Sequence, residues 1–395
     1  MIKRVNYIIL LVSISGAILI AEIFLRIFIP EIGWAQREDK IIGWSNDAYK
    51  LFEPTGRKNE TGKRILFLGD SYLAGSGISD LDKRFPILLE SMLNNKVISK
   101  VLAAGGWGTD QQLLAFNQKG KFFKPDLVIV AFCANNDISD ILSHNHGPKK
   151  LKPYFVIGKD EKLELYDGYG TFINYKTFFQ DGDKYAAQNS QLMRSYLVDY
   201  LRGILKTRIS SNQVNSTGDF KSVNPLYRKF RFWEESPQEL YKRQTKLSWS
   251  PHKGVNHVSA YIHENFKINT YQWRLLEQIL LKLKNEVESS GGKLAVLLLP
   301  VIFNPEDPET IAGGSFIKRF QTPEGYFTFR SDEPRERLRS ITERVGITFY
   351  DPTQEFIKYV ADKDLMKAVW PNPRDRHFSA LGHEILANLL KKMLR

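Results

Sequence analysis

The stretch Arg64-Ile65-Leu66-Phe67-Leu68-Gly69-Asp70-Ser71 carries the strongest indication of the fold, because an apolar run stops abruptly at a turn that presents a hydroxyl group. The apolar part is typical of a buried strand, and Gly-Asp-Ser is a turn composition. Such a turn can simply close a strand. It can also deliver a serine nucleophile, and Asp375-Arg376-His377 near the other end of the chain could supply the base that this serine needs.

Segments of helix and strand type alternate after this first strand. The expected elements are a helix at 85–93, a strand at 100–104, a helix at 111–119 and a strand at 126–132. The last of these contains an unbroken run, Leu-Val-Ile-Val-Ala-Phe, which is typical of a strand covered on both faces. The alternation predicts an α/β domain with a parallel sheet.

The sheet is expected to resume in the C-terminal third of the chain. The predicted elements there are a helix at 271–289, strands at 293–300 and 347–350, and a final helix at 379–394. About 145–265 is expected to be a large insertion, rich in aromatic and basic residues, with one amphipathic helix at 190–206. Residues 303–332, with their Pro and Gly pairs, are expected to be a second, loop-rich insertion.

The N-terminus predicts a membrane anchor. Lys3 and Arg4 precede 23 nearly continuous apolar residues at 7–29, which as a helix would cover about 34 Å against a hydrocarbon core of about 30 Å. The basic residues favour a cytoplasmic N-terminus, so everything after the span would lie outside the cytoplasm. A cleaved signal peptide ending near Ser15-Gly16-Ala17 is the alternative.

The expected domain organisation is therefore a membrane anchor at 1–30, a juxtamembrane linker at 31–62 that packs on the domain edge, and a catalytic body at 63–395. The net charge of +12 is spread along all 395 residues, without a nucleic-acid-binding motif, so nucleic acid is not an expected partner. A membrane surface or an anionic glycan is compatible with this charge. Cys133 is the one cysteine, which excludes an intrachain disulfide and a multi-cysteine metal site.

Four short blocks lie at the carboxyl ends of predicted strands, which in a parallel sheet meet at one edge where ligands bind. The first is Gly69-Asp70-Ser71, with Ser71 as candidate nucleophile. The second is the glycine-rich turn at 104–111, where a backbone N–H can face the site. The third is Asn135-Asn136-Asp137, whose asparagine amide could donate to an oxyanion. The fourth is Asp375-Arg376-His377, with His377 as base and Asp375 holding its tautomer.

Each block alone is more often structural than catalytic. Glycine-rich turns usually connect elements, and Asn-Asn-Asp is a common turn or helix-cap composition. Asp375 read singly would be a surface residue, and His377 would be a residue flanking the last helix. The joint occurrence of the four blocks in this order favours the catalytic interpretation.

The four blocks together resemble the SGNH or GDSL hydrolase family over about 63–140 and 290–395. The resemblance implies a flavodoxin-like three-layer α/β/α sandwich with a central parallel sheet. By likeness, Ser71 is the nucleophile, and Asp375 and His377 complete the triad. The resemblance further implies an oxyanion hole of Ser71, Gly106 and Asn136, with no metal and no cofactor. The Gly-x-Ser-x-Gly elbow of the α/β-hydrolase fold is absent.

The chain departs from the family pattern at three places. Ala134 and Val101 stand where many members have Gly and Asn. Asp375 lies two residues before His377 rather than the commoner three, a spacing also found in the family's polysaccharide O-acetyltransferase branch. The resemblance and the predicted anchor together predict a membrane-anchored, extracytoplasmic serine esterase. It would hydrolyse an acyl ester, O-acetyl above all, on a saccharide or lipid of the cell envelope through an acyl-enzyme on Ser71. O-acyl transfer to a polysaccharide hydroxyl, with partners in polysaccharide modification, is the alternative, and a non-catalytic glycan-binding module is a third possibility.

Several other residues carry weaker expectations. Cys133 is expected to be a buried, inert thiol, and His383 a structural residue of the last helix. His144 and His146 lack an acidic or cysteine partner at metal-ligand spacing. The basic and aromatic stretch 221–253 is expected to be an aromatic-anchored lid, with a carbohydrate platform or a membrane-facing surface as the functional alternative.

Overall fold

The computed structural model describes most of the predicted catalytic body. The described residues are 13–24, 36–39, 41–46, 61–94, 96–142, 151–158, 160–167, 170–175, 177–179, 260–265, 267–303, 308–322, 325–372 and 376–394. The expected helix at 190–206, the stretch 221–253, the histidines 144 and 146, and the proposed triad residue Asp375 lie outside them.

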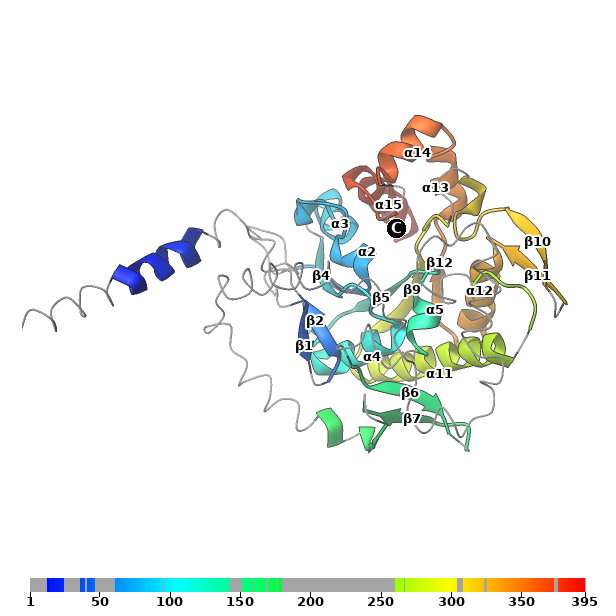
Figure 1. Ribbon diagram of the computed structural model, residues 1–395, viewed down its shortest axis with the longest axis horizontal. Helices are drawn as coiled ribbons and strands as arrows, with labels where there is room; N and C mark the ends of the chain where they lie inside the picture. Colours follow the sequence, from blue (N-terminus) through cyan, green and yellow to red (C-terminus); the bar gives the residue numbers. More distant parts are fainter. Residues whose placement is uncertain are drawn as a thin grey trace, which may run out of the picture.

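A five-stranded parallel sheet forms the centre of the molecule (Figure 1). Its strands run in the order β12-β9-β5-β3-β4, and each neighbouring pair is parallel. Numbered along the chain this is the flavodoxin-like order 2-1-3-4-5. The strands are β3 (Lys63–Gly69), β4 (Val97–Ala103), β5 (Leu127–Phe132), β9 (Lys293–Leu298) and β12 (Thr348–Tyr350).

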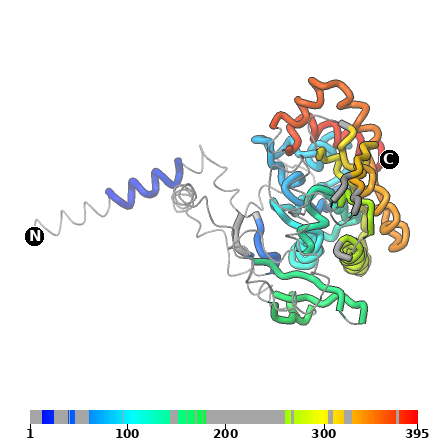
Figure 2. The backbone as a smooth tube through the Cα atoms, turned by 45° about the vertical axis from the view of Figure 1, so that its right-hand side comes forward, coloured from blue at the N-terminus to red at the C-terminus, as the bar shows by residue number. Residues whose placement is uncertain are grey.

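Helices cover both faces of this sheet, so the predicted three layers are present. On one face α3 packs against α15, and on the other α11 packs against α4 and α12. Their bounds are α3 (Phe85–Met92), α4 (Thr109–Gln118), α11 (Lys267–Ser289), α12 (Glu333–Val345) and α15 (Ala380–Met393). In Figure 2 the C-terminal helix α15, drawn in red, lies beside the light-blue segments that follow β3. The predicted strands and helices of the body are confirmed, with shifts of a few residues at their ends.

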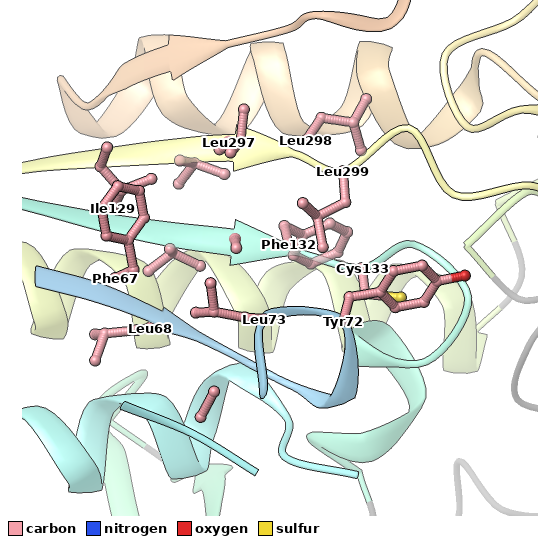
Figure 3. Close-up of a cluster of buried hydrophobic side chains, with 14 of the residues drawn as sticks. Phe67, Leu68, Tyr72, Leu73, Ile129, Phe132, Cys133, Leu297, Leu298 and Leu299 are labelled. Atoms are coloured by element: carbon pink, nitrogen blue, oxygen red, sulfur yellow. The ribbon is translucent and has the colours of Figure 1, made fainter. Parts of the chain in front are cut away.

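The sheet is the core of the protein. All six residues of β5 are buried, as the unbroken apolar run predicted. Phe67 and Leu68 of β3 are fully buried, and Figure 3 shows Phe67 beside Ile129 of the adjacent strand β5, with Leu297 of β9 on the far side of β5. Burial of large apolar side chains contributes about 1.5–3 kcal/mol each. The first of the candidate blocks therefore directly follows a buried strand of the core.

The segment expected to be a linker is partly built into this core. Strands β1 (Gln36–Asp39) and β2 (Gly43–Asn46) form an antiparallel hairpin, and Trp44 is 1% exposed. The indole N–H of Trp44 donates to the carbonyl of Gly105 at 3.0 Å, and Gln111 Nε2 donates to the carbonyl of Ile42 at 2.7 Å. The β1–β2 hairpin thus braces the second block, in addition to the linking role that the sequence predicts.

The two insertions contain strands that the sequence did not predict. In the first, β6 (Tyr154–Ile157), β7 (Leu163–Tyr166) and β8 (Phe172–Ile173) form a small antiparallel sheet. In the second, expected to be loop-rich, β10 (Ile317–Thr322) and β11 (Gly325–Arg330) form a hairpin. These strands are two to six residues long and pair locally, so the helix-and-strand alternation of the body does not reveal them.

Residues 13–24 are helical, inside the apolar segment 7–29 that the sequence predicts to span a membrane. Within the described part of the chain, the structure contains no helix that is both long enough and apolar enough for a membrane span.

His383 is the structural residue that the sequence predicted, and its burial makes a testable contribution to stability. It is fully buried in α15, and its Nδ1 accepts a hydrogen bond from the Phe85 backbone N–H at 3.4 Å. Burial lowers the pKa of His383 to about 3, with Arg84 adding to the effect. Because the unfolded chain takes up this proton near pH 6.5, stability is fully present above that pH and is lost as the pH falls.

We expect His383→Gln, which keeps an acceptor but does not titrate, to flatten the pH dependence of unfolding. Between pH 7 and pH 5 the wild-type chain loses about 2 kcal/mol through this histidine, whereas the variant loses none by this route. Urea unfolding of both full-length proteins at the two pH values measures the difference. Identical losses would show that His383 does not stay neutral in the folded protein.

Candidate active site

Ser71 is placed by a tight strand-to-helix turn at the end of β3. The helix α2 (Ser71–Ala74) starts at Ser71, and Asp70 caps it by accepting from the Tyr72 N–H at 3.0 Å. Gly69 allows the turn because a Cβ there would lie 2.9 Å from the Leu73 side chain. Both interpretations of Gly-Asp-Ser that the sequence left open therefore hold. The turn ends the strand, and it also presents the half-buried hydroxyl of Ser71.

The structure brings His377 to this hydroxyl across the whole domain. His377 Nε2 lies 2.8 Å from Ser71 Oγ, although the two residues are 306 positions apart. This is hydrogen-bond distance between a serine and an imidazole, as general-base activation requires. The predicted pairing of nucleophile and base is therefore present in the geometry.

Tyr72 and Arg376 fix the histidine in this position. The Tyr72 ring lies 4.8 Å from the imidazole, and its hydroxyl donates to the carbonyl of Arg376 at 2.5 Å. Arg376 has a left-handed backbone with φ 57°, which is uncommon for a residue with a Cβ. Its guanidinium donates to the carbonyl of Phe303, so side chain and backbone are both held. Tyr72 was not among the expected site residues, although its place directly after Ser71 was a usable signal.

Asp375, the expected tautomer-holding carboxylate, lies outside the described residues, so its role stays a prediction. Asp70 is a described carboxyl whose charge interacts with His377. Burial raises the pKa of Asp70, and the nearby imidazole opposes that rise. A carboxylate at this position would stabilise a positive charge on the His377 imidazole. The sequence analysis treated Asp70 only as a turn residue.

The two expected oxyanion donors follow the strands that flank β3. Gly69 is paired with Ala103 of β4, and Leu68 with Val130 of β5, so the three strands end at the same edge. Gly106 follows β4 with φ +75°, a conformation that glycine adopts without strain. Asn136 follows β5. Both candidate donors are thus brought to the edge that carries Ser71.

Asn136 has an unusual side-chain arrangement for its place at the start of α5 (Asp137–Asp140). Asparagine at a helix N-cap normally accepts a backbone N–H, but this side chain makes no capping bond. Its Nδ2 instead donates to Asp140 Oδ2 at 2.9 Å. Burial of the carboxyl raises the pKa of Asp140 to about 7, and the Asn136 hydrogen bond opposes the rise. The amide is thereby held by Asp140, and Asp70 is a second carboxyl neighbour of the same side chain, whose hydrogen bond opposes the rise in the pKa of Asp70.

Asn135 connects the site to both insertions. Its Oδ1 accepts from the Tyr261 hydroxyl at 2.5 Å, and its Nδ2 donates to the carbonyl of Ile302 at 3.2 Å. Tyr261 is fully buried and stacks on Phe329 at 4.9 Å. The end of the first insertion and the start of the second are therefore fixed next to the third block. The sequence analysis missed Tyr261, which has no motif around it.

Cys133 is buried at the end of β5 (Figure 3), as expected. Burial and the nearby Asp70 raise its pKa well above the ordinary value, so the thiol stays protonated and inert. Among the described residues, no group of three or more His, Cys, Asp or Glu side chains is arranged to hold a metal.

Known proteins resemble the chain only in overall shape. No protein-family model and no curated protein matches the chain. Solved structures of similar shape include an acetyl xylan esterase, with 9% identity, a TM-score of 0.37, and coverage of 84% of this chain and 100% of that one. Another is a putative GDSL-like lipase from Parabacteroides merdae, with 13% identity, a TM-score of 0.37, and coverage of 86% and 100%.

A third similar structure is an acetylxylan esterase from Geobacillus stearothermophilus, with 12% identity, a TM-score of 0.36, and coverage of 84% of this chain and 95% of that one. Likeness at this level assigns no activity to the chain. The assignment of function therefore depends on the Ser71 and His377 geometry.

The contact between Tyr72 and Arg376 gives a test of how the base is positioned. Tyr72→Phe keeps the ring against His377 and removes the hydrogen bond to the Arg376 carbonyl. We expect kcat for an ester substrate to fall about tenfold, which corresponds to about 1.4 kcal/mol, because the imidazole is less well held. Tyr166→Phe, which removes a hydroxyl bonded to Glu164 in the small sheet, is the matched control. Equal activity of the two variants would contradict a positioning role for Tyr72.

Proposed function

We propose that this protein is a serine esterase that removes an acyl group, O-acetyl above all, through an acyl-enzyme on Ser71. The observation that carries the proposal is the 2.8 Å contact between Ser71 Oγ and His377 Nε2 at the carboxyl edge of a parallel sheet. Gly106 follows β4 and Asn136 follows β5, the two strands that flank β3, so both residues lie toward this edge. A nucleophile, a base and candidate oxyanion donors are the groups that acyl transfer requires.

The first half-reaction forms the acyl-enzyme. Ser71 Oγ attacks the ester carbonyl carbon while its proton passes to His377 Nε2, and the carbonyl electron pair moves onto oxygen. The backbone N–H groups of Ser71 and Gly106 and the Asn136 amide donate to this oxyanion. When the intermediate collapses, the C–O bond of the ester breaks, and His377 returns the proton to the leaving alcohol.

The second half-reaction releases the acid. Water gives a proton to His377 and attacks the acyl carbon, and the Ser71 oxygen leaves and regains a proton from the imidazolium. Asp375 is proposed to hold the histidine tautomer, and Asp70 to stabilise the imidazolium charge. Every step uses groups of this chain, and no metal or cofactor is proposed.

The proposed substrate is an acylated saccharide or lipid of the cell envelope, and the sequence supports this location. The apolar segment 7–29 is proposed as a membrane anchor, with the body outside the cytoplasm. Residues 30–35 between this segment and β1 could extend at most about 22 Å. Because the β1–β2 hairpin contacts the turn of Gly106 through Trp44, an anchored chain would hold the site close to the membrane surface.

Transfer of the acyl group to a sugar hydroxyl is the second candidate function. The observation in its favour is the two-residue spacing of Asp375 and His377, which resembles the O-acetyltransferase branch of the SGNH family. Chemically the two functions differ only in the nucleophile of the second half-reaction. Partners from polysaccharide modification would then supply the donor or the acceptor.

Loss of the nucleophile tests the esterase proposal directly. With an activated acetyl ester and the full-length protein, we expect Ser71→Ala to abolish turnover and labelling by an active-site serine probe. Asn136→Ala is expected to lower kcat by about 10²- to 10³-fold while the Ser71 probe still reacts, as found when one oxyanion donor is removed. Full turnover by Ser71→Ala would refute the assignment. An inactive wild-type chain that the probe also fails to label would instead favour a non-catalytic glycan-binding module.

An acceptor distinguishes hydrolysis from transfer. We expect the rate of acetate release by wild-type protein to stay constant when an envelope oligosaccharide is added, because water already resolves the acyl-enzyme. The measurement follows free acetate and acetylated sugar together, with Ser71→Ala as the blank. A fall in acetate matched by acetylated oligosaccharide would replace the esterase proposal with acyl transfer.

A further inference from the structure

A buried lysine links the two segments that carry the expected oxyanion donors. Lys152 lies just before β6, and its side chain is 1% exposed. Its Nζ contacts Asp110 Oδ2 at 2.5 Å and donates to the backbone carbonyl of Asp140 at 2.7 Å. Asp110 belongs to the first turn of α4, directly after the turn of Gly106, and Asp140 belongs to the helix that starts at Asn136.

Each partner of Lys152 is itself tied to a donor segment. Asp110 Oδ1 accepts from the Gln111 backbone N–H at 2.9 Å, within the same first turn of α4. Asp140 accepts from the Asn136 amide through Oδ2, and its backbone N–H donates to the Asn136 carbonyl at 2.8 Å. A single ammonium group therefore lies between the Gly106 turn and the Asn136 side chain.

The two segments also touch directly, without room for adjustment. A Cβ added to Gly108 would lie 2.8 Å from Asp110 Oδ1 and 3.0 Å from the Asp140 carbonyl carbon. The hairpin closes over the lysine from outside, because a Cβ at Gly43 would overlap Lys152 Cβ. Lys152 is thus confined on both sides, and a shift of the ammonium would shift the donor segments with it.

Stability alone is a poor reason for such a pair. Removing an ammonium and a carboxylate from water costs several kcal/mol each, and replacing a buried ion pair by neutral groups of similar size is often neutral or stabilising. Burial indeed raises the pKa of Asp110, with Lys152 opposing the rise. The ion pair instead fixes the position of the Gly106 turn relative to the Asn136 segment. Apolar packing alone would let these two segments shift against each other more easily.

We propose that Lys152 is a positioning residue for the oxyanion hole: it fixes the distance between the Gly106 turn and the Asn136 amide. The inference deepens the proposed esterase function and rests on it. Lys152 lies outside the four blocks, and no sequence motif marks it. It touches no reacting atom, so its effect is exerted through Gly106 and Asn136.

The test replaces the ion pair with neutral groups of similar size. Lys152→Met alone would leave Asp110 buried without its partner, so the decisive variant is Lys152→Met/Asp110→Asn in the full-length protein. It is compared with wild type and with Lys358→Met, which breaks an exposed ion pair with Glu355. Turnover of an activated acetyl ester is expressed per Ser71 labelled by a serine probe, so misfolded protein is not counted.

We expect the double variant to keep its urea unfolding midpoint and its KM, while kcat falls about 10- to 100-fold, because donors displaced by a fraction of an ångström no longer match the oxyanion. Binding of phenylboronic acid, which forms an anionic adduct on serine, is expected to weaken by the same factor. In an Asn136→Ala background the same two substitutions should lower kcat much less. The Asn136 donor is already missing there, so moving its segment has little further effect.

The outcomes separate the inference from the function beneath it. A wild-type chain without esterase activity would overturn the proposed function. An active wild type with unchanged kcat and boronate affinity in the double variant would overturn the role of Lys152 alone. Two other results would show that the ion pair serves only the stability of the fold. One is an equal loss of kcat with and without the Asn136 side chain, and the other is a loss of kcat that parallels a lower urea unfolding midpoint.

Discussion

The contact between Ser71 Oγ and His377 Nε2 depends on the register of the parallel sheet. Ser71 follows the end of β3, the strand between β4 and β5. His377 precedes α15, which packs against α3 on one face of the sheet. A slip of one residue in β3 would turn every side chain of that strand to the other face. The apolar core thus sets the position of Ser71, and the packing of the last helix brings His377 to it.

The edge of the sheet that carries the site contains an uncommon number of buried charged groups. Asp70, Asp110, Asp137 and Lys152 are all nearly inaccessible to solvent. Burial, with the neighbouring Asp70 adding to the effect, raises the pKa of Asp137 well above its usual range. Such groups weaken a core that apolar residues could fill. Their fixed dipoles are useful where charge develops during a reaction, which is the setting that the site provides.

Residues of the insertions contact the blocks that form the site. Tyr261, Phe303 and Phe329 form a buried aromatic cluster that contacts Asn135 on one side and Arg376 on the other. Arg376 in turn determines where His377 lies. The cluster therefore couples the third and fourth blocks through residues that come from neither. The buried rings thus help to hold the loop of His377 at hydrogen-bond distance from Ser71.

The sequence by itself determined the parallel α/β class and the pairing of Ser71 with His377, because unbroken apolar runs and strand-ending motifs are local patterns. It did not predict the small sheets of the insertions, the hairpin at 36–46, or the roles of Tyr72, Tyr261 and Lys152. These residues act through partners that are distant in the chain, such as Arg376, Asn135 and Asp110. Only tertiary packing decided those contacts, since a hydrogen bond between distant residues leaves no periodicity in either segment.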